Sequence, residues 1–261
     1  MIKVLVNGAL GRMGTQVVAA VDGADDMELV AGVDVMAFEG DVVGSKRKHI
    51  YTDLSKAIDE TGPDVMVDFT APASAEANLR CALGKGVHCV LGTTGLSEEK
   101  LASIYEESAT GGAHLFHAPN FTTGAVLMMV FSQQAAKYFP DAEVIELHHD
   151  GKKDAPSGTA IRTARMIAAA KREASNAPGK ETELEGCEGA RGADVEGVPV
   201  HSVRTDGYVA HQEVIFGSKG QTLTIRHDSI DRSSYMPGVL MAVRAVGDID
   251  GVLVGLENLM D

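Results

Sequence analysis

The densest group of reactive side chains lies in residues 146–159, which read Glu-Leu-His-His-Asp-Gly-Lys-Lys-Asp-Ala-Pro-Ser-Gly-Thr. This segment contains two histidines, two lysines and, from Ser157, the expected start of a helix. Histidine titrates near neutral pH and can donate or accept a proton. The first amides of a helix bind carboxylates. The segment therefore predicts proton transfer on an anionic ligand.

The two neighbouring histidines set a condition on the local backbone. Adjacent residues of a strand point to opposite faces, so His148 and His149 share a pocket only if the strand ends there, as Gly151 suggests. Glu146, His148 and His149 match no metal-binding spacing and have no cysteine close by, so no metal is predicted. Exposed or packed histidines in a basic loop stay open as an alternative, and the other seven histidines are interpreted as structural.

A glycine-rich turn near the N-terminus predicts a second ligand site. Residues 8–14 read Gly-Ala-Leu-Gly-Arg-Met-Gly, directly after an apolar run at 2–6 and before helix-forming residues. The spacing is weak evidence alone, but a strand, a glycine turn and a helix N-terminus together bind pyrophosphate. Asp34 ends the second expected strand, where a carboxylate accepts from ribose hydroxyls. We expect dinucleotide binding; a structural turn with a solvated Asp34 is the alternative.

The choice of dinucleotide is left open by the residues. Val35 follows Asp34, at a position where NADPH-binding proteins often carry arginine, which favours NADH. Lys46, Arg47 and Lys48 could reach a 2′-phosphate, or could form a solvated basic face. Polar loops at 68–72, 92–95 and 118–121 are expected at the same sheet edge.

The elements that position these residues follow from hydrophobic patterning. Apolar runs alternate with helix-like stretches through the first half, which predicts βαβ units and a parallel sheet. We expect strands at 2–6, 27–33, 65–69, 88–91 and 114–117, and helices at 13–21, 53–60, 74–83 and 97–108. The second half of the chain is typical of an α+β domain. We expect helices at 124–139, 157–173 and 237–246 and strands at 143–149, 198–204, 209–217 and 221–228. An irregular loop is expected at 174–197 and a short apolar segment at 252–256.

Composition excludes several classes of partner. The 261 residues carry 23 Lys+Arg against 37 Asp+Glu, a formal net charge of −14, which disfavours nucleic acid and anionic membrane surfaces. No apolar run approaches the ~18 residues of a membrane span, and the first residues do not resemble a signal peptide. Three cysteines without a paired spacing fit a reducing cytoplasm.

The motifs together resemble a known family. The chain resembles the 4-hydroxy-tetrahydrodipicolinate (dihydrodipicolinate) reductases of bacterial diaminopimelate and lysine biosynthesis. The similar motifs occur in the family's order from residue 1 to about 246: GALGRMG, DFTAP, GTTG, APNF and above all ELHH-x-x-K-x-DAPSGTA. The resemblance implies a Rossmann-type parallel-sheet nucleotide domain at 1–121 and 233–261. It also implies an α+β substrate-binding and tetramerisation domain with an open mixed sheet at 122–232.

The resemblance also implies the reaction and its residues. A cyclic imine dicarboxylate would lose water and be reduced by hydride from NADH or NADPH, with His148 as proton donor/acceptor and Lys152 as proton donor. His149, Gly158 and Thr159 would hold the substrate carboxylates. The cofactor would contact Gly8, Ala9, Leu10, Gly11, Arg12, Met13, Asp34, Gly92, Thr93, Thr94, Ala118, Pro119, Asn120 and Phe121. We expect a homotetramer whose substrate lies in a cleft between the domains, with hinges at 119–123 and 229–237. Because Ala71 stands where other members carry a basic residue, it supports no expectation.

Two other functions are weighed against this one. Another nicotinamide-dependent oxidoreductase of a small amino or keto dicarboxylate, such as an aspartate-type dehydrogenase, would use the same motifs. An NAD(H)-responsive regulator without turnover needs a basic DNA-reading helix, which the net acidity disfavours.

Overall fold

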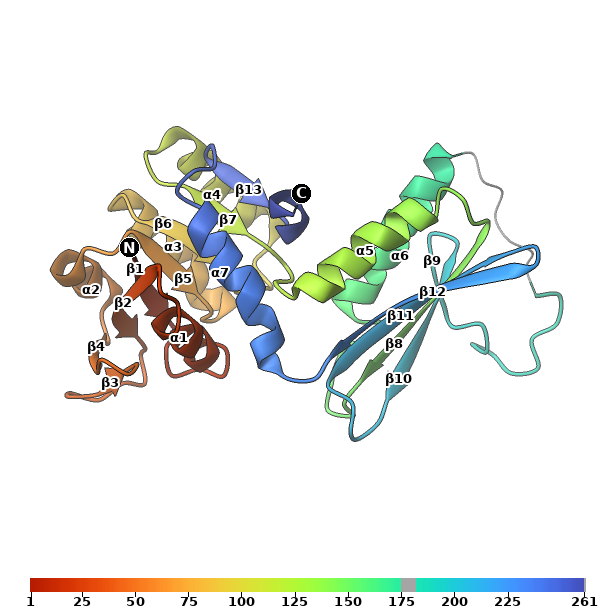
Figure 1. Cartoon of the computed structure of the whole chain (residues 1–261), viewed down its shortest axis with the longest axis horizontal. Coiled ribbons are helices and arrows are strands. Elements are labelled where there is room, and N and C mark those ends of the chain that lie inside the picture. Colours follow the sequence, from red (N-terminus) through yellow and green to blue (C-terminus); the bar gives the residue numbers. More distant parts are fainter. Residues whose placement is uncertain (175–181, 261) are drawn as a thin grey trace. The chain divides into compact units, whose positions relative to one another are not determined.

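The computed structural model describes residues 1–174 and 182–260, and the chain divides into two compact units (Figure 1). Unit 1 comprises Met1–Phe121 and Tyr235–Asp261, and unit 2 comprises Thr122–Ser234. The second boundary lies two residues beyond the expected one at 232/233. Part of the loop expected at 174–197, residues 175–181, lies outside the described residues, and the rest contains a short strand, β9 (Ala193–Val195).

Unit 1 is built on an eight-stranded sheet in the order β13-β7-β6-β5-β1-β2-β4-β3. All neighbouring strands pair in parallel except β3 with β4, and this confirms the expected Rossmann-type sheet. The strands are β1 (Ile2–Asn7), β2 (Met27–Val33), β3 (Val42–Val43), β4 (Lys48–Tyr51), β5 (Val65–Asp68), β6 (His88–Leu91), β7 (Leu115–His117) and β13 (Val252–Val254).

The helices of unit 1 cover both faces of this sheet. On one face α1 (Gly14–Asp22) contacts α7 (Met236–Ala245), and on the other α3 (Pro72–Gly84) contacts both α2 (Leu54–Thr61) and α4 (Glu98–Thr110). Short 3-10 helices follow at Arg232–Tyr235 and Leu256–Leu259. The central strands β1, β5 and β6 are largely buried on both sides, which explains why they read as continuous apolar runs.

The strand order creates a switch point at β1. The chain continues from β1 to β2 on one side and returns to β5 on the other, so the last residues of β1 and β5, Asn7 and Asp68, lie opposite each other. Open parallel sheets bind ligands at the carboxyl ends of strands beside such a switch. The topology therefore places the loops after β1, β2, β5 and β6 where a ligand is expected.

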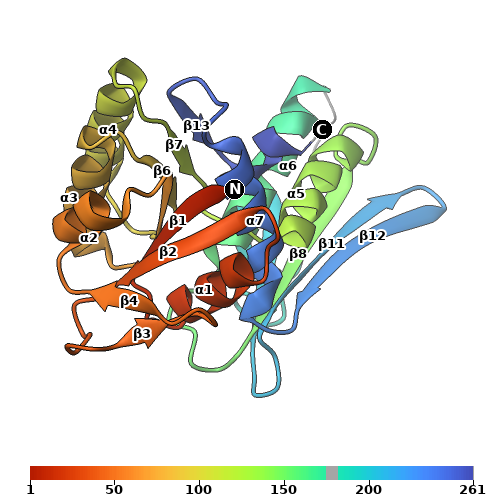
Figure 2. The ribbon, with the colours of Figure 1, turned by 60° about the vertical axis from the view of Figure 1, so that its left-hand side comes forward.

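Unit 2 is a five-stranded mixed sheet in the order β12-β11-β8-β10-β9, with helices α5 (Thr123–Ala135) and α6 (Gly158–Glu173) packed against it and each other (Figure 2). Strand β8 (Asp141–His148) runs parallel to β10 (Val198–Arg204) and antiparallel to β11 (Ala210–Ser218), which pairs with β12 (Gln221–Ser229). Alternate strand residues, including Val144, Val200, Val214 and Phe216, form one core with the helices.

The structure changes several expected element boundaries. Helix α5 ends at Ala135 rather than at residue 139, because the next residues tighten into i→i−3 turns before Pro140, such as Tyr138 N–H donating to Ala135 O. Strand β8 ends at His148, so His149 lies outside it. Strands β3, β4 and β9 were not predicted. No helix among the described residues has the length and apolar content to cross a membrane.

Candidate active site

The glycine loop of unit 1 has the geometry of a cradle for a ligand's phosphates. Gly8 has a φ of +81°, and a Cβ there would lie 2.8 Å from the carbonyl oxygen of Phe69. A Cβ on Gly14 would lie 1.9 Å from the carbonyl oxygen of Gly8. Helix α1 begins at Gly14 and no side chain caps its first amides. The loop therefore requires glycine at these two positions. The uncapped N-terminus of α1 is the kind of helix end that binds phosphate.

Asp34 joins this loop to the end of β2. Its Oδ2 accepts from Leu10 N–H at 2.9 Å, and its Oδ1 accepts from Met36 N–H at 2.9 Å. Each carboxylate oxygen has a second lone pair, so Asp34 can still accept from two hydroxyl groups. The glycine loop, the α1 N-terminus and Asp34 thus fit the phosphates and ribose of a dinucleotide.

Beneath these loops lies a buried carboxylate that sequence reasoning missed. Asp68 has no exposed surface and accepts from the side chains of Asn7 (2.9 Å), Asn78 (3.0 Å), Thr70 (2.8 Å) and Thr93 (2.7 Å). These donors come from β1, α3 and the loops after β5 and β6. One carboxylate therefore fixes several loops at the switch point, including the predicted cofactor residue Thr93.

The other predicted cofactor residues divide by exposure. The exposed ones are Leu10, Gly11, Arg12, Thr94 and Pro119. The half-buried ones are Gly8, Met13, Gly92 and Asn120, and the buried ones are Ala9, Thr93, Ala118 and Phe121. Phe121 packs against Phe69 and Phe116. Any ligand contact of Ala118 or Phe121 in this conformation would therefore use the backbone.

The basic run after β3 does not lie beside Asp34. Lys48 pairs with Glu28 at 3.0 Å, and Glu28 lies near the start of β2, six residues before Asp34. At ~3.3 Å per strand residue, that is about 20 Å. The Lys48 side chain therefore points toward the start of β2 in this conformation, although β4 itself pairs with the later half of β2, Ile50 with Gly32 and Tyr51 with Val33.

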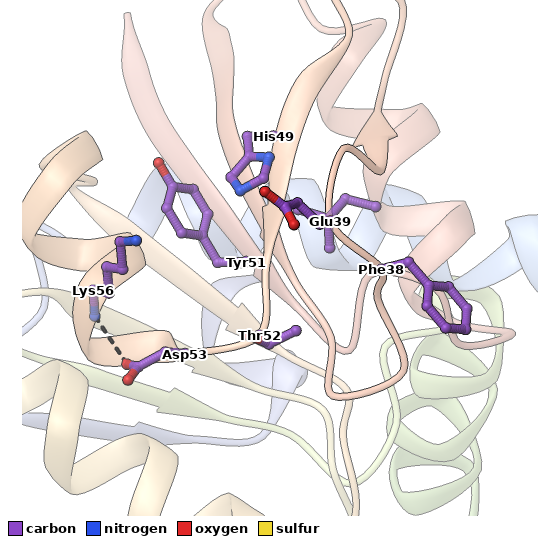
Figure 3. Close-up of a pocket in the computed structure, with 8 residues that line it drawn as sticks. Phe38, Glu39, His49, Tyr51, Thr52, Asp53 and Lys56 are labelled. Carbon is purple, nitrogen blue, oxygen red and sulfur yellow. Dashed lines mark hydrogen bonds between the residues drawn. The ribbon is translucent and has the colours of Figure 1, made fainter.

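A cavity of about 360 Å³ lies beside β4, between the loop after β2 and the start of α2 (Figure 3). Its walls carry both charges and one aromatic pair, His49 against Tyr51. The lining residues are Phe38, Glu39, His49, Ile50, Tyr51, Thr52, Asp53 and Lys56. It includes none of the predicted site residues.

In unit 2 the predicted histidine lies in a cluster of hydrogen-bonded charged side chains. Glu146 and His148 share one face of β8, and the buried Glu146 carboxylate is hydrogen-bonded to His148 Nδ1. Arg204, paired with His148 across the parallel β10, donates to both Glu146 oxygens at 2.8 and 2.7 Å. Ser157 N–H donates to Glu146 Oε1 at 3.2 Å. Glu146 thus joins β8, β10 and the start of α6.

The loop after β8 carries the predicted lysine. Lys152 Nζ lies 2.6 Å from Asp154 Oδ1, and the Lys152 backbone N–H donates to His149 O at 3.2 Å. Arg204 also donates to the backbone oxygen of Asp154 at 2.7 Å. The Arg204 guanidinium therefore contacts both Glu146, the partner of His148, and the loop that carries Lys152.

Helix α6 begins beside this cluster. Ser157 caps it, with Oγ accepting from Ala160 N–H at 3.2 Å. The first helical residue, Gly158, has nothing within 4 Å of the place where a Cβ would stand, so a ligand can approach the amide end. The predicted binding residues Gly158 and Thr159 thus start a capped helix whose dipole favours an anion.

The charges in this cluster stabilise each other. Burial alone would raise the pKa of Glu146, but hydrogen bonds from His148 and Arg204 outweigh it and lower that pKa to about 2. The hydrogen bond from Lys152 lowers the pKa of Asp154. Hydrogen bonding to Glu146 raises the pKa of Arg204. Glu146 and Asp154 are therefore carboxylates at neutral pH, and Arg204 is a cation.

Five of the other seven histidines have structural partners. His201 contacts Glu143, His211 contacts Asp228, His117 contacts Tyr105, and His88 stacks on His114. Among residues 1–174 and 182–260, no three His, Cys, Asp or Glu side chains are grouped to hold a metal ion.

Sequence reasoning missed Arg204, and it considered Glu146 solely as a metal ligand. Glu146 could have been found, because residues two apart on a strand share a face. Arg204 gave no such signal, because it lies 58 residues from Glu146 and meets it through the pairing of β8 with β10.

Comparison with known proteins gives a consistent family match. Residues 2–121 match the family model "Dihydrodipicolinate reductase, N-terminus", and residues 124–260 match "Dihydrodipicolinate reductase, C-terminus". A 4-hydroxy-tetrahydrodipicolinate reductase of Mycolicibacterium vanbaalenii is 50% identical over 260 residues, 99% of each chain. One of Listeria welshimeri is 48% identical, covering 99% of this chain and 100% of its own. The solved dipicolinate-bound dihydrodipicolinate reductase from Paenisporosarcina sp. TG-14 superposes with a TM-score of 0.89, 42% identity and full coverage of both chains.

The glycine cradle gives a direct test. Gly14→Ala places a Cβ against the Gly8 carbonyl, so the loop must shift. We expect NADH binding, measured by fluorescence titration, to weaken at least ~10-fold and unit 1 to lose about 1–3 kcal/mol of stability from overpacking. Gly84→Ala is the matched control, because nothing lies within 4 Å of its Cβ position. Wild-type NADH affinity in Gly14→Ala would contradict this account of the loop.

Proposed function

The chain belongs to the dihydrodipicolinate reductase family, and from that premise we propose that it reduces 4-hydroxy-tetrahydrodipicolinate to tetrahydrodipicolinate with NADH or NADPH, in diaminopimelate and lysine biosynthesis. The observation that carries the proposal is the grouping of His148, Lys152 and the α6 N-terminus around Glu146 and Arg204. The solved Paenisporosarcina relative is bound to dipicolinate, which is a ring dicarboxylate like the proposed substrate.

We assign the binding of the substrate carboxylates to unit 2. Gly158 and Thr159 start helix α6, where backbone amides and the helix dipole attract anions. His149 lies just outside β8 and is exposed, so it can turn toward a carboxylate. These groups orient the ring without reacting with it.

We assign the proton chemistry to His148 and Lys152. Loss of water from the substrate gives a conjugated imine, and reduction of that imine directs negative charge toward the ring nitrogen, which a proton must neutralise. A bound nicotinamide nucleotide supplies the hydride. Lys152 is the proposed proton donor and His148 the acid/base partner, since both carry exchangeable protons. Arg204 is linked to His148 through Glu146 and to Lys152 through Asp154.

We assign the dinucleotide to unit 1, on Gly8–Met13, Asp34, and the loops at 92–94 and 118–121. The cradle at Gly8 and Gly14 supports phosphate binding, and the two spare lone pairs of Asp34 support ribose binding. Residues 35–38 are Val-Met-Ala-Phe and Lys48 is paired with Glu28, which supports NADH over NADPH.

We also propose a homotetramer that assembles through the sheet of unit 2. Both α5 and α6 pack against that sheet, whose β8 alternates between the buried residues Ala142 and Val144 and the half-buried Ile145 and Leu147. Light scattering that returned the 27.4 kDa of a single chain would refute the tetramer.

Turnover of the cyclic product of the preceding aldolase tests the activity. Purified chain mixed with this substrate and NADH should consume NADH, and NADPH should support no higher kcat/KM. A preference of ~100-fold for NADPH, about 2.7 kcal/mol, would refute the cofactor assignment. Turnover of L-aspartate with NAD⁺, without turnover of the aldolase product, would instead support an aspartate-type dehydrogenase.

Lys152→Ala tests the proton donor. Removing a general acid typically costs ~10²–10⁴ in rate, so kcat should fall at least ~100-fold. Lys153→Ala is the matched control, because this exposed neighbour has no assigned role. An unchanged kcat in Lys152→Ala would remove Lys152 from the mechanism.

A further inference from the structure

The carboxylate of Glu146 is the most completely bonded group near the reacting residues. It is hydrogen-bonded to two guanidinium nitrogens of Arg204, the backbone N–H of Ser157, Nδ1 of His148 and the side chain of Ser202. A carboxylate has about four lone-pair sites, so these contacts occupy all of them. Building such a group into the interior has a desolvation cost that full pairing must offset.

We propose that Glu146, held by Arg204, is a positioning residue that keeps a proton on Nδ1 of His148 and so presents a lone pair at Nε2 to the substrate. The inference rests on the proposed function, which makes His148 a reacting group. It adds a fixed tautomer of His148, with Nε2 as the atom that exchanges the proton, which membership of the family does not by itself supply.

The protonation state of Glu146 determines which atom donates. Arg204 donates to both oxygens and the Ser157 N–H donates to one of them, which is the environment of an ionised carboxylate. An ionised carboxylate accepts hydrogen bonds and cannot donate them. Nδ1 of His148 must therefore be the donor in this hydrogen bond.

A fixed Nδ1–H restricts what His148 can do. A neutral imidazole has one N–H, so Nε2, on the far edge of the ring from Glu146, then carries a lone pair and accepts a proton. Acceptance gives an imidazolium whose charge faces the Glu146 carboxylate, and return of the proton from Nε2 restores the neutral ring. Neutral His148 is thus a base, while the proton that neutralises the reduced ring comes from Lys152 or from the imidazolium.

Arg204 extends the same control to the lysine loop. Its Nη2 donates both to Glu146 and to the backbone oxygen of Asp154, whose side chain contacts Lys152 Nζ at 2.6 Å. One guanidinium therefore sets the position of the base and of the loop that carries the acid. A lysine in place of Arg204 cannot reproduce this planar, multidentate contact.

A purely structural role for Glu146 predicts different results. If Glu146 merely held α6 through Ser157, its loss would weaken substrate binding and stability but leave the His148 tautomer unchanged. If it also fixes His148, then kcat and the tautomer change while dicarboxylate affinity changes little. Glutamine separates the two roles, because with its amide oxygen toward Ser157 it keeps that contact, while its NH₂ group replaces the oxygen that accepts from His148 Nδ1.

The test compares Glu146→Gln with Glu143→Gln. Glu143 lies on the opposite face of β8 and contacts Arg191 and His201, so it matches Glu146 in strand and partner types. In Glu146→Gln we expect kcat to fall at least ~10-fold, as when a carboxylate behind a catalytic histidine is neutralised. Dipicolinate affinity should change less than ~3-fold, about 0.65 kcal/mol. Glu143→Gln should keep wild-type kcat.

The ¹⁵N chemical shifts of His148 supply a second readout. In the wild-type chain at a pH where the ring is neutral, we expect Nδ1–H, and in Glu146→Gln a mixture of tautomers. Wild-type kcat in folded Glu146→Gln, or a fall in dipicolinate affinity that matches the fall in kcat, would overturn the proposal. If Glu146→Gln does not fold, an Nε2–H tautomer in the wild-type chain overturns it and Nδ1–H supports it. Absence of turnover in the wild-type chain would refute the proposed function instead.

Discussion

A carboxylate buried in a protein must be fully hydrogen-bonded or it becomes protonated, and this constraint shapes unit 2. Glu146 has no exposed surface and meets the constraint with donors from β8, β10 and the start of α6. Each donor is fixed by an element of the fold: His148 by the end of β8, Arg204 by its pairing in β10, and Ser157 by its place as the α6 cap. The Glu146 carboxylate therefore holds the end of the sheet and the start of α6 together.

Unit 1 applies the same constraint at its switch point. Asp68 is buried at the end of β5 and accepts from four side chains on the surrounding loops and helix α3. The glycine loop then packs closely above, because a Cβ on Gly8 would meet the Phe69 carbonyl. In each unit a buried carboxylate holds together loops that are distant in sequence, and exposed groups beside it are left to bind ligands.

The sequence predicted elements well wherever the signal was local. Strands 27–33, 88–91 and 198–204 follow from apolar runs, and the start of α6 after Ser157 follows from residue type. The short strands β3, β4 and β9 were missed because two to four residues at a sheet edge carry no periodicity. Arg204 and Asp68 were missed as organising residues because their partners meet through strand pairing and loop packing. The ion pair of Lys48 with Glu28 was missed because it depends on how β4 lies along β2.

The central claim is that Glu146 stays ionised while buried, and the ¹³C shift of its side-chain carboxyl measures this directly. On lowering the pH of the folded chain, the shift should stay at the ionised value well below the ordinary pKa of 4.5, with a midpoint near 2 or none before unfolding. A midpoint at or above 4.5 would contradict the account, because a protonated Glu146 could donate to His148 and would no longer fix its proton.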